Sequence, residues 1–260
     1  MPDPLDMSDK VVIVTGGCRG VGRGIAERFL DAGAHVVVCC RHEPETLPRG
    51  GDRDASFIAA DVREAEEIDK VIGFATARFG RVDVLVNNAG GSPPVDSATA
   101  SPKFSTAIIS LNLIAPLVFA QKANAVMQDQ SEGGVIINIA SVSGLRPSPG
   151  TAAYGAAKAG LLNLTATLGM DFAPKVRVNA VTAGLVKTEQ SHLFYGDEDG
   201  IAAVGATVPL GRMAEPSDVA DVCLFLASPL ARYVSGESIV VHGGGERPAY
   251  LDAAKNTAGP

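Results

Sequence analysis

The chain has 260 residues, a net charge of −7 and a sequence pI of about 5.1, and 46% of its residues are hydrophobic. This acidic balance disfavours nucleic acids and acidic membranes as partners, because both bind basic protein surfaces. The apolar content suffices for one large buried core, which argues against intrinsic disorder. No apolar run approaches the roughly 18 residues that span a bilayer, and residues 1–10 lack a signal-like apolar stretch, so we expect a cytoplasmic protein.

Short β-branched runs alternate with amphipathic helical stretches along the chain. The predicted strands cover residues 10–15, 35–40, 55–60, 82–87, 135–140, 176–181 and 238–242, and the predicted helices cover 20–32, 63–79, 102–130, 152–172 and 216–227. Near-continuous apolar strands alternating with helices indicate a parallel sheet that is covered on both faces. The sequence therefore predicts a single doubly wound α/β domain over residues 1–260, with a mostly parallel seven-stranded sheet.

Three irregular segments, 41–54, 141–151 and 184–212, separate the predicted elements. The last is too long for an ordinary connection, so we interpret residues 184–212 as a substrate lid. Its aromatic cluster at 193–195 either closes over an apolar substrate or packs within the lid. Residues 246–260 are rich in small side chains and are interpreted as a loose C-terminal tail.

The four cysteines lack the spacing of a zinc or redox site. Cys39 and Cys40 are neighbours, so in a strand they would point to opposite faces. We expect all four, Cys18, Cys39, Cys40 and Cys223, to be small buried or half-buried side chains. The histidines also lack metal-ligand spacing, and no metal is expected.

The first predicted strand runs into the glycine-rich sequence TGGCRGVG at residues 15–22. Gly16, Gly20 and Gly22 would allow a tight turn, close approach of a pyrophosphate to backbone N–H groups, and packing of the helix on the strand. Such a pattern alone also fits an ordinary turn, but its position between the first strand and first helix indicates a dinucleotide site.

Tyr154 and Lys158 lie four residues apart in a predicted helix, so both side chains share one face. A phenol ordinarily has a pKa of about 10, and a nearby cation favours the phenolate. Tyr154 could therefore exchange protons nearer to neutral pH. Taken alone, the pair is better interpreted as an ordinary helical surface pair.

Several short segments together resemble the short-chain dehydrogenase/reductase family in their order and spacing, over residues 10–245. The resemblance implies a Rossmann-type fold. The residues that carry it are Thr15 to Gly22, Asp61-Val62, Asn87-Asn88-Ala89-Gly90, Asn112, Ser141, Tyr154, Lys158 and Val186-Lys187-Thr188.

The resemblance implies four catalytic residues. Tyr154 would be the general acid or base, and Ser141 would hydrogen-bond the substrate oxygen. Lys158 would lower the Tyr154 pKa and hold the nicotinamide ribose, while Asn112 would anchor a water that relays protons.

The resemblance also implies a set of cofactor contacts. Asp61 would bond the adenine amino group, Asn88 and Gly90 would line the ribose, and Thr188 would bind the carboxamide. The full implied set is Gly16, Arg19, Gly20, Val21, Gly22, Arg41, Asp61, Val62, Asn88, Ala89, Gly90, Tyr154, Lys158, Gly184, Val186 and Thr188.

The end of the second strand bears on the choice of cofactor. NAD-specific relatives usually carry an acidic residue there, where this chain has Cys40 followed by Arg41. Together with Arg19, Arg41 could bind a ribose 2′-phosphate, since a guanidinium binds phosphate bidentately. We expect NADP(H) to be preferred, with NAD(H) as the alternative; two merely solvated arginines would leave no preference.

The expected reaction interconverts a secondary alcohol and a ketone of a small molecule. Two positions depart from the family pattern, Ala183-Gly184 and His242, and neither removes a catalytic group. One alternative is a 3-oxoacyl thioester reductase acting on acyl carrier protein or CoA, although residues 123–135 lack the Lys or Arg that an acidic carrier needs. Another is a non-catalytic dinucleotide sensor or scaffold. A homo-oligomer, dimer or tetramer, is expected through helices 102–130 and 152–172.

Overall fold

Seven apolar, β-branched segments form one parallel sheet, as the alternation along the sequence predicts. The structure is a computed structural model that describes residues 3–255. The strands are β1 (Val11–Thr15), β2 (His35–Cys40), β5 (Ser56–Ala59), β6 (Val84–Asn87), β7 (Gly134–Ser141), β8 (Val176–Ala183) and β9 (Ser238–Val241). They lie in the order β5-β2-β1-β6-β7-β8-β9, and every neighbouring pair is parallel.

The direction of strand addition reverses at β1. From β1 the chain adds β2 and β5 on one side, and it then crosses over to place β6, β7, β8 and β9 on the other. In open parallel sheets, ligands bind beyond the carboxyl ends of the strands at such a reversal. The topology therefore marks the ends of β1 and β6 as the place for a site.

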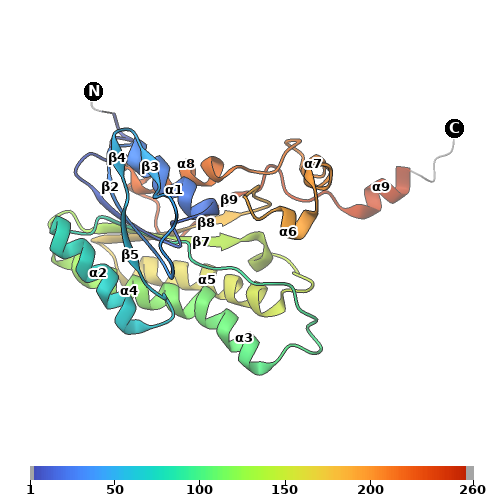
Figure 1. Ribbon diagram of the computed structural model, residues 1–260, viewed down its shortest axis with the longest axis horizontal. Helices are drawn as coiled ribbons and strands as arrows, with labels where there is room; N and C mark the ends of the chain where they lie inside the picture. The colour runs from blue at the N-terminus through green and yellow to red at the C-terminus, as the bar shows by residue number, and fades with distance from the viewer. Residues whose placement is uncertain (1–2, 256–260) are drawn as a thin grey trace.

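Helices cover both faces of the sheet. The helices that pack around the sheet are α1 (Gly20–Asp31), α2 (Ala65–Phe79), α3 (Pro102–Ile109), α4 (Ala115–Asp129), α5 (Ala152–Asp171) and α8 (Pro216–Ala227). Figure 1 shows α1 and α8 on one side of the sheet and α2, α4 and α5 on the other. This layering confirms the predicted doubly wound α/β fold.

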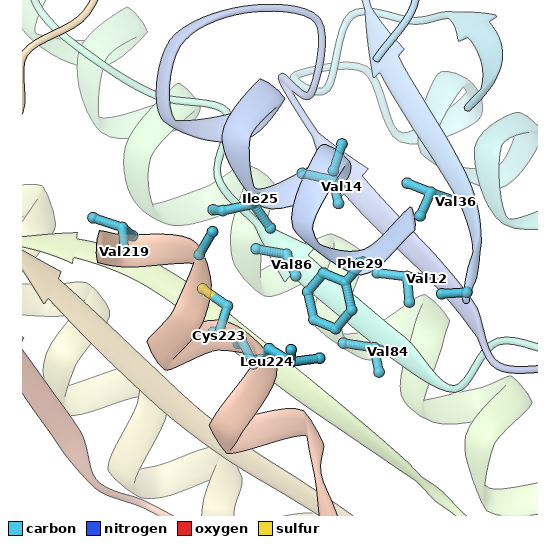
Figure 2. Packing of buried hydrophobic residues seen from close by; sticks show 14 of the residues in the cluster. Val12, Val14, Ile25, Phe29, Val36, Val84, Val86, Val219, Cys223 and Leu224 are labelled. Carbon is cyan, nitrogen blue, oxygen red and sulfur yellow. The ribbon is translucent and has the colours of Figure 1, made fainter. Parts of the chain in front are cut away.

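The period-2 geometry of a strand divides the core into two layers. Val12 and Val14 of β1 pack toward α1 and α8, whereas Val11 and Ile13 pack on the opposite face. Figure 2 shows Phe29 of α1, which is fully buried, lying among the valines of the strands. Burying a side chain of this kind contributes roughly 1.5–3 kcal/mol, so the first strand and first helix are firmly held together.

The predicted helix at 102–130 is interrupted by one π turn, Ser110–Ile114, between α3 and α4. By length and composition alone, Pro102–Asp129 could cross a membrane, with a mean hydropathy of 1.6 over its most apolar window. The sequence did not suggest a membrane span here, because polar residues interrupt the apolar run. The helix packs against α2 and α5, so its apolar residues serve in part as core.

Smaller elements occupy the segments that the sequence leaves irregular. A short hairpin lies in 41–54, two helices lie in the predicted lid, and a helix in the predicted tail stands apart from the sheet in Figure 1. Residues 256–260 of that tail lie outside the described residues. These elements are β3 (Arg49–Gly50), β4 (Arg53–Asp54), α6 (His192–Tyr195), α7 (Glu198–Ala206) and α9 (Ala249–Lys255), with single 3₁₀ turns at Val142–Gly144 and Pro229–Ala231.

All four cysteines are buried or half-buried, as expected, and two of them form a bond that the sequence did not indicate. Cys18 and Cys40 form a disulfide with their Cα atoms 6.5 Å apart. Sequence spacing hides this bond because it depends on the pairing of β1 with β2, which brings the glycine-rich turn beside the end of β2. Cys39 does point to the opposite face, where it is buried and free, as is Cys223.

A cluster of charges ties the amino ends of the central strands together. The carboxylate of Asp83 accepts hydrogen bonds from the backbone N–H of Val11, at 2.9 Å, and from Arg81 Nε, at 2.8 Å. Lys10 Nζ contacts Glu132 at 2.5 Å and lies 3.7 Å from Asp83. These contacts fix β1, β6 and the start of β7 at the edge opposite the carboxyl ends.

Candidate active site

The implied site residues follow four adjacent strands at their carboxyl ends. The glycine-rich turn follows β1, Asn88 and Gly90 follow β6, Ser141 ends β7, and the lid follows β8. The adjacency of these strands in the sheet brings together segments that are far apart in the sequence.

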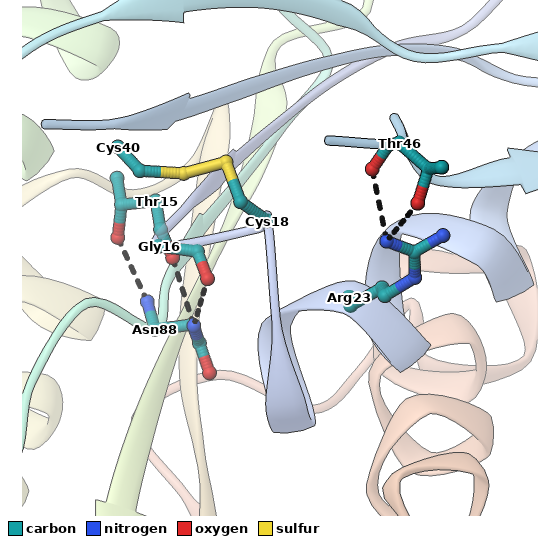
Figure 3. The surroundings of a disulfide bond; sticks show 7 residues. All are labelled: Thr15, Gly16, Cys18, Arg23, Cys40, Thr46 and Asn88. Atoms are coloured by element: carbon teal, nitrogen blue, oxygen red, sulfur yellow. Dashed lines mark hydrogen bonds between the residues drawn. A yellow bond between two sulfur atoms is a disulfide. The ribbon is translucent and has the colours of Figure 1, made fainter. Parts of the chain in front are cut away.

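Asn88 clamps the glycine-rich turn against β6. Its Nδ2 donates to the carbonyl oxygens of Thr15, at 2.9 Å, and Gly16, at 3.3 Å, as Figure 3 shows. In return, Thr15 Oγ1 accepts from the backbone N–H groups of Asn88 and Ala89, each at 2.9 Å. A Cβ on Gly22 would lie 2.3 Å from Asn88 Nδ2. Gly22 therefore makes room for this clamp, a role that the sequence reasoning assigned to helix packing and the cofactor.

The first backbone N–H of α1 is hydrogen-bonded to a carboxylate side chain. Gly20 donates its backbone N–H to Glu189 Oε1 at 3.0 Å, and α1 has no capping side chain and no acidic residue in its first turn. A helix N-terminus favours negative charge, so the lid carboxylate stands where a phosphate group would bind. The turn therefore fits a dinucleotide pyrophosphate. Sequence reasoning missed Glu189, whose only signal is its place directly after the implied Thr188.

Three of the four implied catalytic residues meet between β7 and α5. Ser141 and Tyr154 are hydrogen-bonding partners, and Lys158 Nζ lies 5.6 Å from the centroid of the Tyr154 ring. Lys158 Nζ donates to the Ile139 carbonyl oxygen at 2.7 Å. The structure thus brings together a hydroxyl, a phenol and an ammonium.

Burial sets the protonation of this group. It raises the pKa of Tyr154 above its usual value, and the hydrogen bond with Ser141 partly offsets that rise. The pKa of Lys158, which is fully buried, is lowered by burial from 10.5 to about 8. Burial is the largest influence on the Tyr154 pKa, and the expected lowering of that pKa by Lys158 stays a prediction.

Asn112 lies within the π turn and holds the loop that follows β6. Its Nδ2 donates to the carbonyl oxygens of Gly91, at 3.0 Å, and Ile108, at 2.9 Å, while its Oδ1 accepts from the Gly91 N–H at 2.9 Å. A Cβ on Gly90 would lie 2.6 Å from Asn112 Oδ1 and 3.4 Å from Lys158 Nζ. Asn112 and Lys158 thus lie on the same side of Gly90, and the anchoring of a water by Asn112 stays a prediction.

The implied adenosine contacts surround the end of β2. Asp61 accepts from Arg63 Nε at 2.9 Å, and this hydrogen bond lowers the pKa of the Asp61 carboxyl, with a smaller electrostatic contribution from Arg41. Val62 is buried, whereas Arg41 and Arg19 are exposed.

The lid contributes the remaining implied contacts. Thr188 donates its N–H to Ser191 Oγ at 2.9 Å, and its Cγ2 lies 3.5 Å from where a Cβ on Gly20 would be. Val186 forms a single β-bridge with Ala214. A cleft of about 400 Å³ separates the lid from α8 and is lined by Lys187, Thr188, Glu189, His192, Glu198, Ile201, Glu215 and Pro216. Gly184 packs against His242, and its implied cofactor contact stays a prediction.

No group of three or more His, Cys, Asp or Glu side chains within residues 3–255 could hold a metal ion.

Comparison with known proteins identifies the family. A family model described as enoyl-(acyl carrier protein) reductase matches residues 16–246. A 3α-hydroxysteroid dehydrogenase of Mediterraneibacter gnavus is 34% identical over 91% of this chain and 97% of its own length. An L-rhamnose 1-dehydrogenase (NAD(P)(+)) of Azotobacter vinelandii is 35% identical over 91% of this chain and 96% of its own length.

A solved structure agrees with the sequence relatives. The ligand-free aldohexose dehydrogenase of Thermoplasma acidophilum superposes with a TM-score of 0.84 at 32% identity, covering 92% of this chain and 94% of that chain. Both the fold and the sequence are thus shared over nearly the whole length. The chain therefore belongs to the short-chain dehydrogenase/reductase family of oxidoreductases.

Proposed function

We propose that this protein is an NAD(P)(H)-dependent oxidoreductase that interconverts a secondary alcohol and a ketone, with Tyr154 as the general acid or base. The observation that carries the proposal is the meeting of Ser141, Tyr154 and Lys158 at the same edge of the sheet as the glycine-rich turn. A non-catalytic dinucleotide sensor would have no need of this group, so the catalytic function is favoured.

Each member of the group has a distinct task in carbonyl reduction. Ser141 donates a hydrogen bond to the carbonyl oxygen and polarises the bond. Tyr154 transfers its phenolic proton to that oxygen as negative charge develops there. Lys158 has a pKa of about 8, so it is mostly cationic at pH 7 and stabilises the resulting phenolate. When bound, the nicotinamide cofactor supplies or accepts the hydride.

Replacing Tyr154 by Phe tests the proton-transfer role. We expect Tyr154→Phe to lower kcat for ketone reduction by about 10²- to 10⁴-fold, because the proton donor is lost. NADPH binding, followed by fluorescence titration, should stay close to that of the wild type. Tyr233→Phe is the matched control, because Tyr233 is fully exposed and lies outside the proposed site. Substantial ketone reduction by Tyr154→Phe would contradict the assignment.

We propose NADP(H) as the preferred cofactor, on the grounds that Arg19 and Arg41 are exposed near the end of β2 and no carboxylate occupies the end of that strand. A relative that is named for NAD(P)(+) supports the use of either dinucleotide. We expect kcat/KM to be higher with NADPH than with NADH, and Arg41→Ala should lower the value for NADPH selectively. Comparable kcat/KM values for the two cofactors would contradict the preference.

We propose a small hydroxy or keto compound as the substrate, with an alicyclic or steroid-like ketone favoured. The exposed Leu193 and Phe194 on the lid could cover an apolar substrate, and one relative is named for hydroxysteroids. The family model is named for an acyl-carrier-protein reductase, which keeps a 3-oxoacyl thioester as the second candidate. NADPH consumption with a 3-oxosteroid, an aldose and a 3-oxoacyl-CoA separates these candidates. If the protein binds NADPH but reduces none of these compounds, the non-catalytic dinucleotide sensor is favoured.

The proposed location of the protein is the cytoplasm.

A further inference from the structure

The Cys18–Cys40 disulfide joins two segments that the proposed function places around the adenosine ribose. Cys18 lies in the glycine-rich turn and Cys40 ends β2, with Cα atoms 6.5 Å apart. Each cysteine is followed directly in the chain by an arginine, Arg19 or Arg41. The bond therefore links the backbones from which both phosphate-binding candidates project.

The disulfide supports the turn on the side that Asn88 does not reach. Figure 3 shows Asn88 holding Thr15 and Gly16 from β6, while the disulfide crosses to β2 on the other side of the turn. The turn is hydrogen-bonded on both flanks, since the Gly16 N–H also donates to the Cys39 carbonyl oxygen of β2 at 2.8 Å, and the disulfide adds a covalent support on the β2 flank. Only the covalent support depends on the redox state.

The two sulfurs also differ from the other thiols in accessibility. Cys18 is buried with 9% of its surface exposed, Cys40 is half-buried and Arg41 beside it is exposed, whereas Cys39 and Cys223 have no exposed surface. Burial raises the pKa of the Cys39 thiol to about 12, so that thiol stays protonated and unreactive. A small thiol would meet the disulfide before it met either buried cysteine.

We propose that Cys18 and Cys40 form a thiol–disulfide site that controls NADP(H) binding, an inference that rests on the proposed cofactor. Two molecules of a small thiol such as glutathione reduce the bond. The first attacks one sulfur and releases the other cysteine as a thiol, and the second attacks the mixed disulfide. The products are two cysteine thiols and one small-molecule disulfide, with two electrons transferred, and glutathione disulfide drives the reverse reaction.

The intact bond favours binding because it limits the motion of the turn relative to β2. A preorganised pair of arginines loses less conformational entropy when it closes on a 2′-phosphate. The dinucleotide without that phosphate gains much less from this pair, so its binding depends less on the bond. The oxidised protein should therefore bind NADPH more tightly than the reduced protein, and the preference for NADPH over NADH should fall on reduction.

Thiol counting and cofactor titration of the full chain test the proposal. Under denaturing conditions, we expect two free thiols in the air-oxidised protein and four after dithiothreitol treatment. By fluorescence titration, reduction should raise the Kd for NADPH by about 3- to 10-fold and leave that for NADH within about 2-fold. Glutathione disulfide should restore the original NADPH affinity.

Two variants separate the disulfide from general effects of reduction. Cys40→Ser should bind NADPH like the reduced wild type with or without dithiothreitol, while Cys223→Ala should keep the full redox response. Four free thiols in the air-oxidised protein, or equal NADPH affinities in both redox states, would overturn the inference and leave the proposed function standing. A protein that binds neither dinucleotide in either state would overturn the proposed function as well.

Discussion

The ammonium group of Lys158 is buried, and burying its charge lowers the stability of the folded state. The side chain is fully buried, and burial lowers its pKa from 10.5 to about 8. Below pH 8 the lysine is protonated in both the folded and the unfolded chain, so the folded state carries the whole cost of burying the charge. Between about pH 8 and 10.5 only the unfolded chain keeps the proton, and the stability of the folded state rises with pH.

Replacing Lys158 by Met should therefore separate stability from catalysis. We expect Lys158→Met to raise the free energy of unfolding by roughly 1–3 kcal/mol at pH 7, because the buried charge is removed. This advantage should shrink as the pH approaches 10, where the wild-type lysine is already neutral in the folded state. Urea unfolding at several pH values measures both, and ketone reduction should be lost at every pH.

Lys103→Met is the matched control, because Lys103 is exposed on α3 and no burial cost can be relieved there. Its effect on stability should be small and independent of pH. A Lys158→Met variant that is less stable than the wild type at pH 7 would show that the hydrogen bond to Ile139 outweighs the buried charge.

At this scale, the sequence predicts the residues that share a motif and misses those that meet across the fold. Tyr154 and Lys158 are four residues apart on one helix, so their proximity can be read directly. Glu189 lies 169 residues from Gly20, and nothing local indicates that its carboxylate would reach the N-terminus of α1. The pairing of Cys18 with Cys40 is hidden for the same reason, because it depends on strand order.

Contact between the lid and α1 makes cofactor binding a competition between two anions. Glu189 of the lid accepts the Gly20 N–H at which a pyrophosphate would bind. We expect Glu189→Gln to lower the Kd for NADPH by about 2- to 5-fold at low salt, since a negative charge at a helix N-terminus is worth roughly 0.3–1 kcal/mol. Fluorescence titration measures the change, and added salt should reduce it.

Asp199→Asn is the control for this effect, since it removes one negative charge from the same lid at an exposed position on α7. It should leave the Kd for NADPH nearly unchanged. Weaker NADPH binding by Glu189→Gln would contradict the competition and would indicate that the carboxylate helps to hold the lid in its binding position.

The long elements could be predicted because their periodicity is strong, and the short ones could not. The strand at 35–40 has the predicted bounds, and α5 ends one residue before the predicted helix. The helices α6 and α7 lie in a segment interpreted as irregular, because helices of four and nine residues are too short to show a clear period. The π turn within 102–130 leaves no local signal, since its residues are ordinary helix formers.

For the whole molecule, exposed apolar side chains on the α3 to α4 helix favour an assembly of several copies. Ile109 and Ile114 are 36% and 46% exposed on this helix, which the sequence analysis proposes as a contact surface together with α5. We expect light scattering to give the mass of a dimer or tetramer, and Ile114→Glu should shift the protein toward smaller species. A monomer mass for the wild-type chain would contradict the proposal.

The charge cluster around Asp83 has a consequence for how the molecule opens. It secures the amino ends of β1 and β6, while the opposite ends depend on a turn, two loops and a lid. Local fluctuations should therefore start at the carboxyl edge and fade toward the cluster, so that the two edges differ in their rates of amide hydrogen exchange. We therefore expect the side chains at the carboxyl edge to adjust to a ligand while the amino ends of the strands and the core keep their positions.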